Sequence, residues 1–508
     1  MALTKVSYSM ITGASVNVLD YGTDTAAFTA AIAKCIATKS SLYIPAGTYT
    51  ASIIVPPLSH GLTIVGEDWE STIIEAVDGT QHGIELQANS FYVTIANLQI
   101  KNTLAANDGN HCGILSAGSG LGNGNSGLII NRVKVSGYNF NIKIDEFNNT
   151  HLETVWLTGA VVDGAVAKSG SSLYAGHPTI HCVGLYMRDL HIAAGEYGIY
   201  GETWEGCTMS DCEVLLSNKQ GFIHQISGTG VIGMFLTNCY FDSTSLDALY
   251  LEGVNNGTFS NIWLSASTGT GRGLYLVDCS YNAFTNVQAF DNLGGGIFLL
   301  QNSQYNQFSN CVIRNNTGYG IQIANSNNPG NVFSTCNVTG NTTADILFSD
   351  ATPANPNTLN QCVYATKTIQ TKDITTPNQT ITLPFTRLNL ADGAFAGDLY
   401  YASGTEQTKY ISPYSGSILS ISLALNDTRI AGSLIARPLV DGIAQDGIRV
   451  VVDGTNTQYV TRAGSYGTAS VVAGQSIGIY YDTDAAWDTA GAASSVDMVV
   501  TITFATQA

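Results

Sequence analysis

The sequence predicts an all-β protein: a right-handed parallel β-helix, a helical cap before it and a jelly-roll-like β-sandwich after it. Three observations lead to this fold class: a repeat of 23 to 25 residues, strand-like alternation within each repeat, and a charged content of only 11%. The repeat is clearest where MFLTNCYFD, TFSNIWLS, AFTNVQAF, QFSNCVIR and VFSTCNVT follow one another. A fixed period of short strands and turns is the signature of a solenoid.

The amino-terminal segment, residues 1–60, is predicted to be a linker and a cap. Residues 25–37, TAAFTAAIAKCIA, are the only convincing helix, because Phe28, Ala31, Ile32 and Cys35 share one face. An apolar face of this kind suits a cap over the open core of the first coil. SLYIPAGTY (41–49) then predicts the first strand and turn.

The β-helix is predicted over residues 61–350, with three short strands in each coil. One position marks the repeat, and we expect it to hold a bend residue whose side chain can bond its neighbour on the next coil. Alternation after this position predicts stacked inward side chains. The marker position is occupied by Asn97, Arg132, Thr154, Asp189, Asp211, Asn238, Asn261, Asn286, Asn310 and Thr335.

Four cysteines fall on this inward register: Cys212, Cys239, Cys311 and Cys336. We expect them to be free thiols that pack as small core residues. His177, His181 and Cys182 have loosely ligand-like spacing within a Gly- and Ser-rich insertion. Metal is the weaker interpretation of this group, and we expect no metal and no cofactor.

The coil period ends near residue 350. Residues 351–364, rich in Pro and Asn, are predicted to be a linker. Residues 365–508 carry alternating strands without the period, which predicts a β-sandwich for trimerisation or for carbohydrate binding.

Composition excludes several classes of partner. The formal net charge of −18 argues against nucleic acid and against an anionic membrane surface. No segment is long and apolar enough to span a membrane, and no secretion signal is evident.

The run VNVLDYG, TDTAAFTAAI and LYIPAGTY (16–49) resembles the opening of the pectate-lyase-superfamily β-helix in bacteriophage tailspikes. YSMITGASVNVLDYG resembles the linker that enters those spikes, although no GDG-type insertion separates Gly22 from Thr23. The resemblance implies a homotrimeric virion component that folds in the host cytoplasm. It also implies attachment to the phage tail or baseplate through the amino terminus.

Outward positions show where chemistry would occur on such a rod. On the strand after the marker they form a ladder of large aromatic and polar side chains, which suits a groove for stacked sugar rings. Glu213 and Asp242 lie on neighbouring coils in this region, and we predict them as acid and as base or nucleophile of a glycosidase. The alternative is that both are ordinary solvated carboxylates. The ladder comprises Trp156, His191, Glu213, Tyr240, Trp263 and Gln288.

A second outward ladder on the next strand holds the reserve pair Glu202 and Glu252, beside Tyr200 and Tyr250. Its far end, Tyr275 to Leu300, is apolar, as a subunit interface would be. The predicted function is binding of a bacterial capsule or O-antigen and its endo-cleavage by hydrolysis. Two alternatives stay open: a polysaccharide lyase of the same fold, and a non-catalytic adhesin.

Overall fold

The structure is a computed structural model. It describes residues 14–104, 109–120, 124–163, 165–226, 231–324, 327–348, 357–365, 367–369, 378–391, 396–401, 410–412, 416–455, 458–463, 469–489 and 495–506. The chain divides into two compact units, residues 1–374 and 375–508. The predicted entry linker before residue 14 lies outside the described residues.

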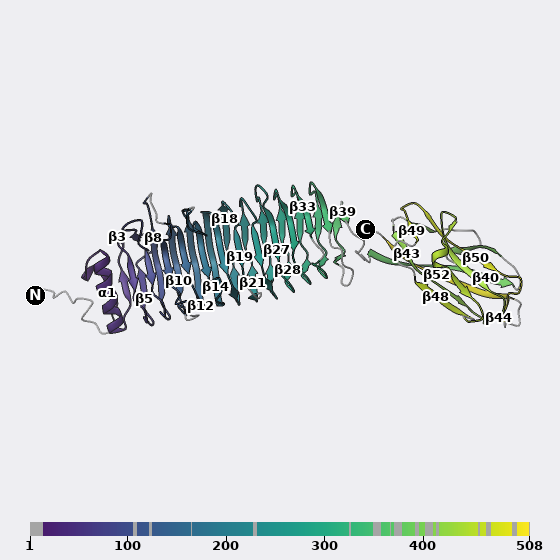
Figure 1. Cartoon of the computed structure of the whole chain (residues 1–508), viewed down its shortest axis with the longest axis horizontal. Coiled ribbons are helices and arrows are strands. Elements are labelled where there is room, and N and C mark those ends of the chain that lie inside the picture. Colours follow the sequence, from purple (N-terminus) through teal and green to yellow (C-terminus); the bar gives the residue numbers. More distant parts are fainter. Residues whose placement is uncertain are drawn as a thin grey trace, which may run out of the picture. The chain divides into compact units, whose positions relative to one another are not determined.

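The first unit begins with strand β1 (Val16–Asn17) and a 3-10 turn at Val18–Asp20, which are followed by helix α1 (Thr25–Thr38), as predicted. Asp24 caps it by accepting a hydrogen bond from the Ala27 amide (2.9 Å), and Lys39 ends it in the left-handed conformation. Its buried face includes Phe28, which meets the Tyr49 ring edge-on with centroids 5.8 Å apart. The helix therefore covers the core of the first coil (Figure 1).

After α1 the chain winds into a right-handed parallel β-helix. Each coil adds two short strands to a 24-stranded sheet and one strand to a 13-stranded sheet, and every pairing between coils is parallel. Figure 1 shows the strands stacked along this unit. The 13-stranded sheet comprises β4 (Ile53–Val55), β7 (Ile84–Leu86), β9 (Cys112–Ser116), β11 (Phe140–Ile144), β13 (Ser171–Gly176), β15 (Tyr197–Glu202), β19 (Phe222–Gln225), β23 (Leu249–Glu252), β27 (Arg272–Val277), β30 (Gly295–Leu300), β33 (Tyr319–Ile323), β36 (Ala344–Phe348) and β39 (Lys367–Ile369).

The strands of the large sheet that carry the site residues flank a bend at the marker position. Four strands, β8 (Thr94–Lys101), β10, β12 and β14, run through this bend, and in later coils it separates two shorter strands. These strands are β10 (Ile129–Ser136), β12 (Asn148–Thr158), β14 (Cys182–Gly195), β17 (Cys207–Ser210), β18 (Glu213–Ser217), β21 (Met234–Thr237), β22 (Tyr240–Asp242), β25 (Thr258–Ser260), β26 (Trp263–Ser265), β29 (Gln288–Phe290) and β32 (Val312–Arg314).

The marker positions are bends, as predicted: all ten have a φ between 52° and 55°. Their side chains bond from coil to coil, with Asn261 donating to Asn238 (3.0 Å) and Asn286 donating to Asn261 (3.1 Å). This ladder of marker side chains is exposed, so it satisfies polar groups at the surface and not in the core. Buried amide ladders lie elsewhere, in Asn282, Asn306, Asn331 and Asn357 and in Asn292, Asn316 and Asn341.

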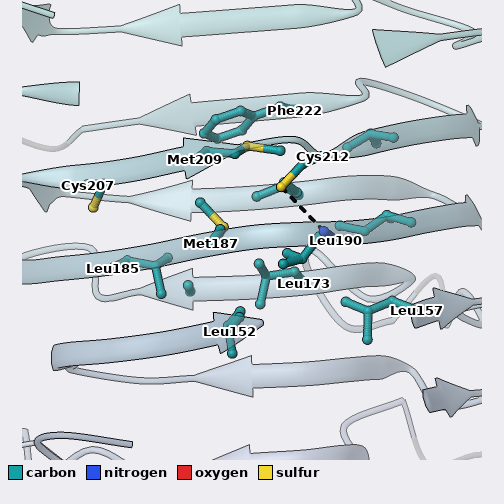
Figure 2. Close-up of a cluster of buried hydrophobic side chains, with 14 of the residues drawn as sticks. Leu152, Leu157, Leu173, Leu185, Met187, Leu190, Cys207, Met209, Cys212 and Phe222 are labelled. Carbon is teal, nitrogen blue, oxygen red and sulfur yellow. Dashed lines mark hydrogen bonds between the residues drawn. The ribbon is translucent and has the colours of Figure 1, made fainter. Parts of the chain in front are cut away.

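The core repeats one type of side chain at the spacing of the coils. Phe259, Phe284, Phe308 and Phe333 stack with successive ring centroids 4.6 Å apart. Beside them, leucines, methionines and cysteines fill the interior (Figure 2), where the Leu190 amide donates to the Cys212 sulfur (3.4 Å). All ten cysteines are free thiols, and nine of them are buried, so the predicted thiol packing is confirmed.

The β-helix extends further than we predicted. Strands β37 (Thr358–Asn360) and β38 (Val363–Tyr364) fall in the predicted linker 351–364, yet they pair in parallel with β34 (Val332–Ser334) and β35 (Asn337–Thr339). Strand β39 then pairs with β36. The coil period in fact continues there, because Gln361 follows the marker residue Thr335 by 26 residues and forms the same bend, with a φ of 54°.

The second unit is antiparallel, with its own hydrophobic core. Its longest pairings join β52 (Ser495–Thr506) to β40 (Asn378–Ala391) and to β43 (Gly416–Leu425). Strands β45 (Leu434–Val440) and β50 (Ser476–Thr483) pair beside them. Among the residues described in both units, no helix is long and apolar enough to cross a membrane.

Candidate functional site

The predicted ladder of outward residues exists, and its register is that of the coils. Trp156 pairs with His191, His191 with Glu213, Glu213 with Tyr240, Tyr240 with Trp263, and Trp263 with Gln288. Alternation forces this arrangement, because the flanking residues of each strand are buried in the core.

A groove of about 380 Å³ lies over the middle of this ladder. Trp156 stands at one end, 42% exposed, with its ring 4.6 Å from that of His191. Tyr240 stands at the other end and stacks on Trp263 at 5.1 Å. The lining residues are Trp156, Asp189, Leu190, His191, Asp211, Cys212, Glu213, Asn238 and Tyr240.

The polar centre of the groove is the hydrogen-bonded pair of His191 Nδ1 and Glu213 Oε1. The side chains are 26% and 44% exposed, so both can reach a bound molecule. Two marker residues, Asp189 and Asp211, add carboxylates to the lining, and Asn238 donates to Asp211 (3.0 Å). We had interpreted these two aspartates only as bend residues, because the sequence does not show that the bend opens into a groove.

Asp242 lies next to the groove and not in its lining. The Ser243 hydroxyl donates to one carboxylate oxygen (2.8 Å), and the Ser265 hydroxyl donates to the other. Ser265 in turn accepts a hydrogen bond from Trp263 Nε1 (2.7 Å). The structure therefore brings Glu213, His191, Trp156 and Tyr240 together, with Asp242 and Trp263 one step further along the same face.

The aromatic row begins earlier than the sequence indicated. Trp69 meets Trp156 edge-on, with ring centroids 6.0 Å apart. Lys134, the partner of Trp156 on the preceding coil, lies over both rings, at 4.7 and 5.1 Å, and pairs with Glu70. Trp69 was missed because it lies in a turn after a strand and has no place in the repeat.

The second ladder is also in register, but its side chains are largely covered. Tyr200 is 6% and Ile223 5% exposed, and both pack with Phe140 and Tyr174 in a separate small core. Lys168, from the insertion between β12 and β13, lies over the rings of Tyr174 and Tyr200 at 5.5 and 5.1 Å. We call this surface of the 13-stranded sheet, from Phe140 to Phe298, the second face.

The reserve pair on the second face is held in place by its neighbours. Lys168 and the Tyr174 hydroxyl donate to the two oxygens of Glu202, whose side chain is 9% exposed. The Tyr250 hydroxyl donates to Glu252 (3.3 Å). Burial raises the pKa of Glu252, while hydrogen bonds from Tyr250 and Gln225 oppose that rise.

Two other predictions from this region can be compared with the structure. The segment GETWEGC (201–207) predicts a loop for Trp204 and Glu205, but they form strand β16 (Trp204–Glu205), and the Trp204 side chain is fully buried. The inward register of His224 predicts a core histidine; it is buried, and burial lowers its pKa to about 4.

His177, His181 and Cys182, the weak metal candidate, do not form a cluster of metal ligands. His181 lies 3.7 Å from Glu205, and Cys182 is buried in β14. Within the described ranges, no three His, Cys, Asp or Glu side chains are grouped so that they could hold a metal ion.

The fold and groove define a class of protein, the right-handed parallel β-helix with an exposed aromatic groove. The profile of the family described as right handed beta helix region matches residues 197–362. No curated protein sequence matches the chain.

Several solved structures are similar to this chain, and the first of them shares its fold. Tailspike protein 3 of bacteriophage CBA120 is similar, with a TM-score of 0.52 and 12% identity over 72% of this chain. The chain spans 62% of that tailspike's length. The A-module of the mannuronan C-5 epimerase AlgE4 from Azotobacter vinelandii has a TM-score of 0.45 and 14% identity, over 70% of this chain and 99% of that chain. Tailspike protein gp49 from Acinetobacter baumannii bacteriophage Fri1, a capsular polysaccharide depolymerase, has a TM-score of 0.39 and 12% identity, over 97% of this chain and 84% of that chain.

Proposed function

We propose that this chain is a phage tailspike that binds and depolymerises a bacterial surface polysaccharide in the groove. The observation that carries the proposal is the solvent-facing aromatic row from Trp69 to Trp263, half-buried except for the exposed Trp156, with the His191–Glu213 pair in its middle. Ring faces accept the C–H groups of sugars, and charged groups between them accept hydroxyls. The amino-terminal motif at residues 16–49 supports the viral context.

The chemistry that fits these residues is glycoside hydrolysis. Glu213 donates a proton to the leaving glycosidic oxygen, and a second carboxylate either activates water or attacks the sugar carbon. Asp242 is our predicted partner, and Asp211 competes with it because it lines the groove. Carboxyl groups about 5 Å apart give retention of configuration, and those about 6.5–9.5 Å apart give inversion.

Hydrolysis fits the groove better than elimination does. A lyase that acts on a uronate must neutralise the sugar carboxylate beside the proton that it removes. The lining contains Asp189, Asp211 and Glu213, and its one group that can become cationic is His191, already paired with Glu213. Lys134 lies over the rings of Trp69 and Trp156 at the end of the groove, and Arg132 lies over Trp69; neither belongs to the lining, and each is paired with an acid.

We further propose a homotrimer, attached to the phage tail through its amino terminus. The apolar end of the second face, where Arg272 lies 4.4 Å from the rings of Tyr275 and Phe298, supplies an interface. The second unit would act as a jelly-roll-like sandwich for trimerisation or carbohydrate binding. A solution mass of three chains supports this assembly, and a mass of one chain contradicts it.

The deciding experiment incubates the protein with purified capsular and O-antigen polysaccharides from a panel of strains. Hydrolysis shortens one polysaccharide and yields saturated products. Elimination yields unsaturated sugars with ultraviolet absorbance, and an adhesin binds without shortening the chain. If no polysaccharide of the panel is bound or cut, the proposed function is wrong.

A further inference from the structure

Outward side chains that precede the bend form another aromatic row, which the sequence analysis did not identify. Ile129 pairs with His151, His151 with Tyr186, Tyr186 with Thr208, and Thr208 with Phe235. Tyr186 is 39% and Phe235 43% exposed. We call this row, from His151 to Phe235, the pre-bend strip.

The pre-bend strip is hollowed. The rings of His151 and Tyr186 stack at 4.6 Å with an angle of 16°, which presents a flat aromatic surface. Thr208 lies on the coil between Tyr186 and Phe235, so the two rings are separated by two coil rises, about 9.6 Å. A groove of about 320 Å³ lies at this strip. Its lining residues are His151, Leu152, Glu153, Tyr186, Met187, Arg188, Thr208 and Ser210.

Polar groups border these rings. Asn131 donates to Glu153 (3.0 Å), and Glu153 lies 3.7 Å from Arg188, whose side chain is 69% exposed. Thr208 and Ser210 place hydroxyl groups in the lining. Sugar rings bind to protein surfaces through aromatic faces and through hydrogen-bonding groups beside them. The strip offers both, because an amide, a carboxylate, a guanidinium and hydroxyls flank its rings.

The same coils build both grooves. Strand β17 supplies Thr208 and Ser210 to the pre-bend strip, and β18 begins with Glu213, with the Asp211 bend between them. Likewise, β14 supplies Tyr186 before the bend and His191 after it. The two surfaces are therefore continuous across Asp189 and Asp211.

We propose that the pre-bend strip binds a second segment of the same polysaccharide, outside the point of cleavage. This inference rests on the proposed function. The strip would hold a long glycan at the protein surface while the groove acts on another part of it. A glycan too short to occupy both surfaces gains nothing from the strip.

The test compares long and short forms of one glycan. The probe is the polysaccharide that the wild-type protein selects from the panel, together with the limit oligosaccharides of its own digestion. Binding is measured in the Glu213→Gln background, so that the probe stays intact. Tyr186→Ala with Phe235→Ala should weaken binding of the long polysaccharide about two- to tenfold for each ring removed. Binding of the limit oligosaccharides should not change.

Tyr281→Ala is the matched control, because Tyr281 is 60% exposed, stacks on Tyr305 and lines neither groove. Melting temperatures of all variants establish that they are folded. If the double variant binds the long polysaccharide as tightly as the control does, while Trp156→Ala weakens it, the strip is not a binding site and the proposed function stands. If the wild-type protein binds no polysaccharide, both proposals are wrong.

Discussion

The two outward faces of the β-helix carry similar residues and present them differently. Both have aromatic rings on successive coils with carboxylates between them. In the groove, Trp156 and Glu213 are each more than 40% exposed, and Glu213 has His191 as its partner. On the second face, Glu202 is 9% exposed and both of its oxygens are occupied by Lys168 and Tyr174.

The difference comes from the chain that passes above each sheet. The insertion between β12 and β13 supplies Lys168 to the second face, whereas the groove lies beside the tight bends at Asp189 and Asp211. A residue that points outward from a solenoid is therefore not necessarily exposed. This comparison leads us to prefer Glu213 over Glu202 as a catalytic group, and the following predictions test it.

The largest effect is expected for Glu213→Gln, and for Asp242→Asn if Asp242 is its partner. Loss of a positioned acid or base lowers the rate about 10²- to 10⁴-fold. Binding and melting should change little, because Glu213 is 44% exposed and forms no part of the core. Initial rates on the selected polysaccharide measure this effect. The rate of Asp211→Asn is measured in the same way, and its loss would identify Asp211 as the second carboxylate in place of Asp242. If Glu202→Gln and Glu252→Gln remove activity while Glu213→Gln and Asp242→Asn remain active, the choice of face is wrong.

Glu202→Gln should mainly change stability. The substitution leaves the Lys168 ammonium beside a neutral amide and gives Tyr174 a weaker acceptor within a covered network. Disturbing such buried hydrogen bonds costs about 1–3 kcal/mol. Thermal and denaturant unfolding measure the loss, and Glu213→Gln is the exposed control. An unchanged free energy of unfolding would contradict the closed network that we describe on the second face.

Trp156→Ala and Trp263→Ala should weaken polysaccharide binding by about two- to tenfold each, because a stacking surface is lost. The effect should appear in the dissociation constant measured in the Glu213→Gln background. Phe298→Ala on the second face is the matched aromatic control, since Phe298 is 9% exposed. If Phe298→Ala weakens binding equally, the glycan binds the second face, and our choice of the groove is wrong.

The smallest effect concerns Glu252 and pH. Because burial raises its pKa in the folded protein, the folded state holds this proton more tightly than the unfolded state does. Ionised Glu252 therefore opposes folding above its raised pKa, and this penalty disappears as the pH falls below its ordinary range. Glu252→Gln should then gain stability relative to wild type at neutral pH, and the gain should shrink in acid. A difference in melting temperature that does not vary between neutral and acidic pH would contradict the assignment.

Repetition made much of the fold predictable from the sequence. The period placed the marker residues, and alternation placed Leu190 and Cys212 inside and Trp156 and Glu213 outside, because a strand side chain has only two directions available. The cap helix was predictable for a similar reason: Phe28 and Ile32 recur at helical spacing. The end of the β-helix was predicted too early, although the period continues: Gln361 follows Thr335 by 26 residues and forms the same bend.

The sequence by itself thus determined the parallel β-helix and the order of its outward ladders. Only the tertiary structure decided which ladder is open, since exposure depends on insertions such as the one that brings Lys168 over Tyr200. It also decided that Asp189 and Asp211 line a groove, which their place in the period does not show. It decided as well that Trp69 joins Trp156, a contact between parts of the chain that no period relates. Local periodicity fixes the direction of a side chain, whereas its surroundings are fixed by the loops that fold over it.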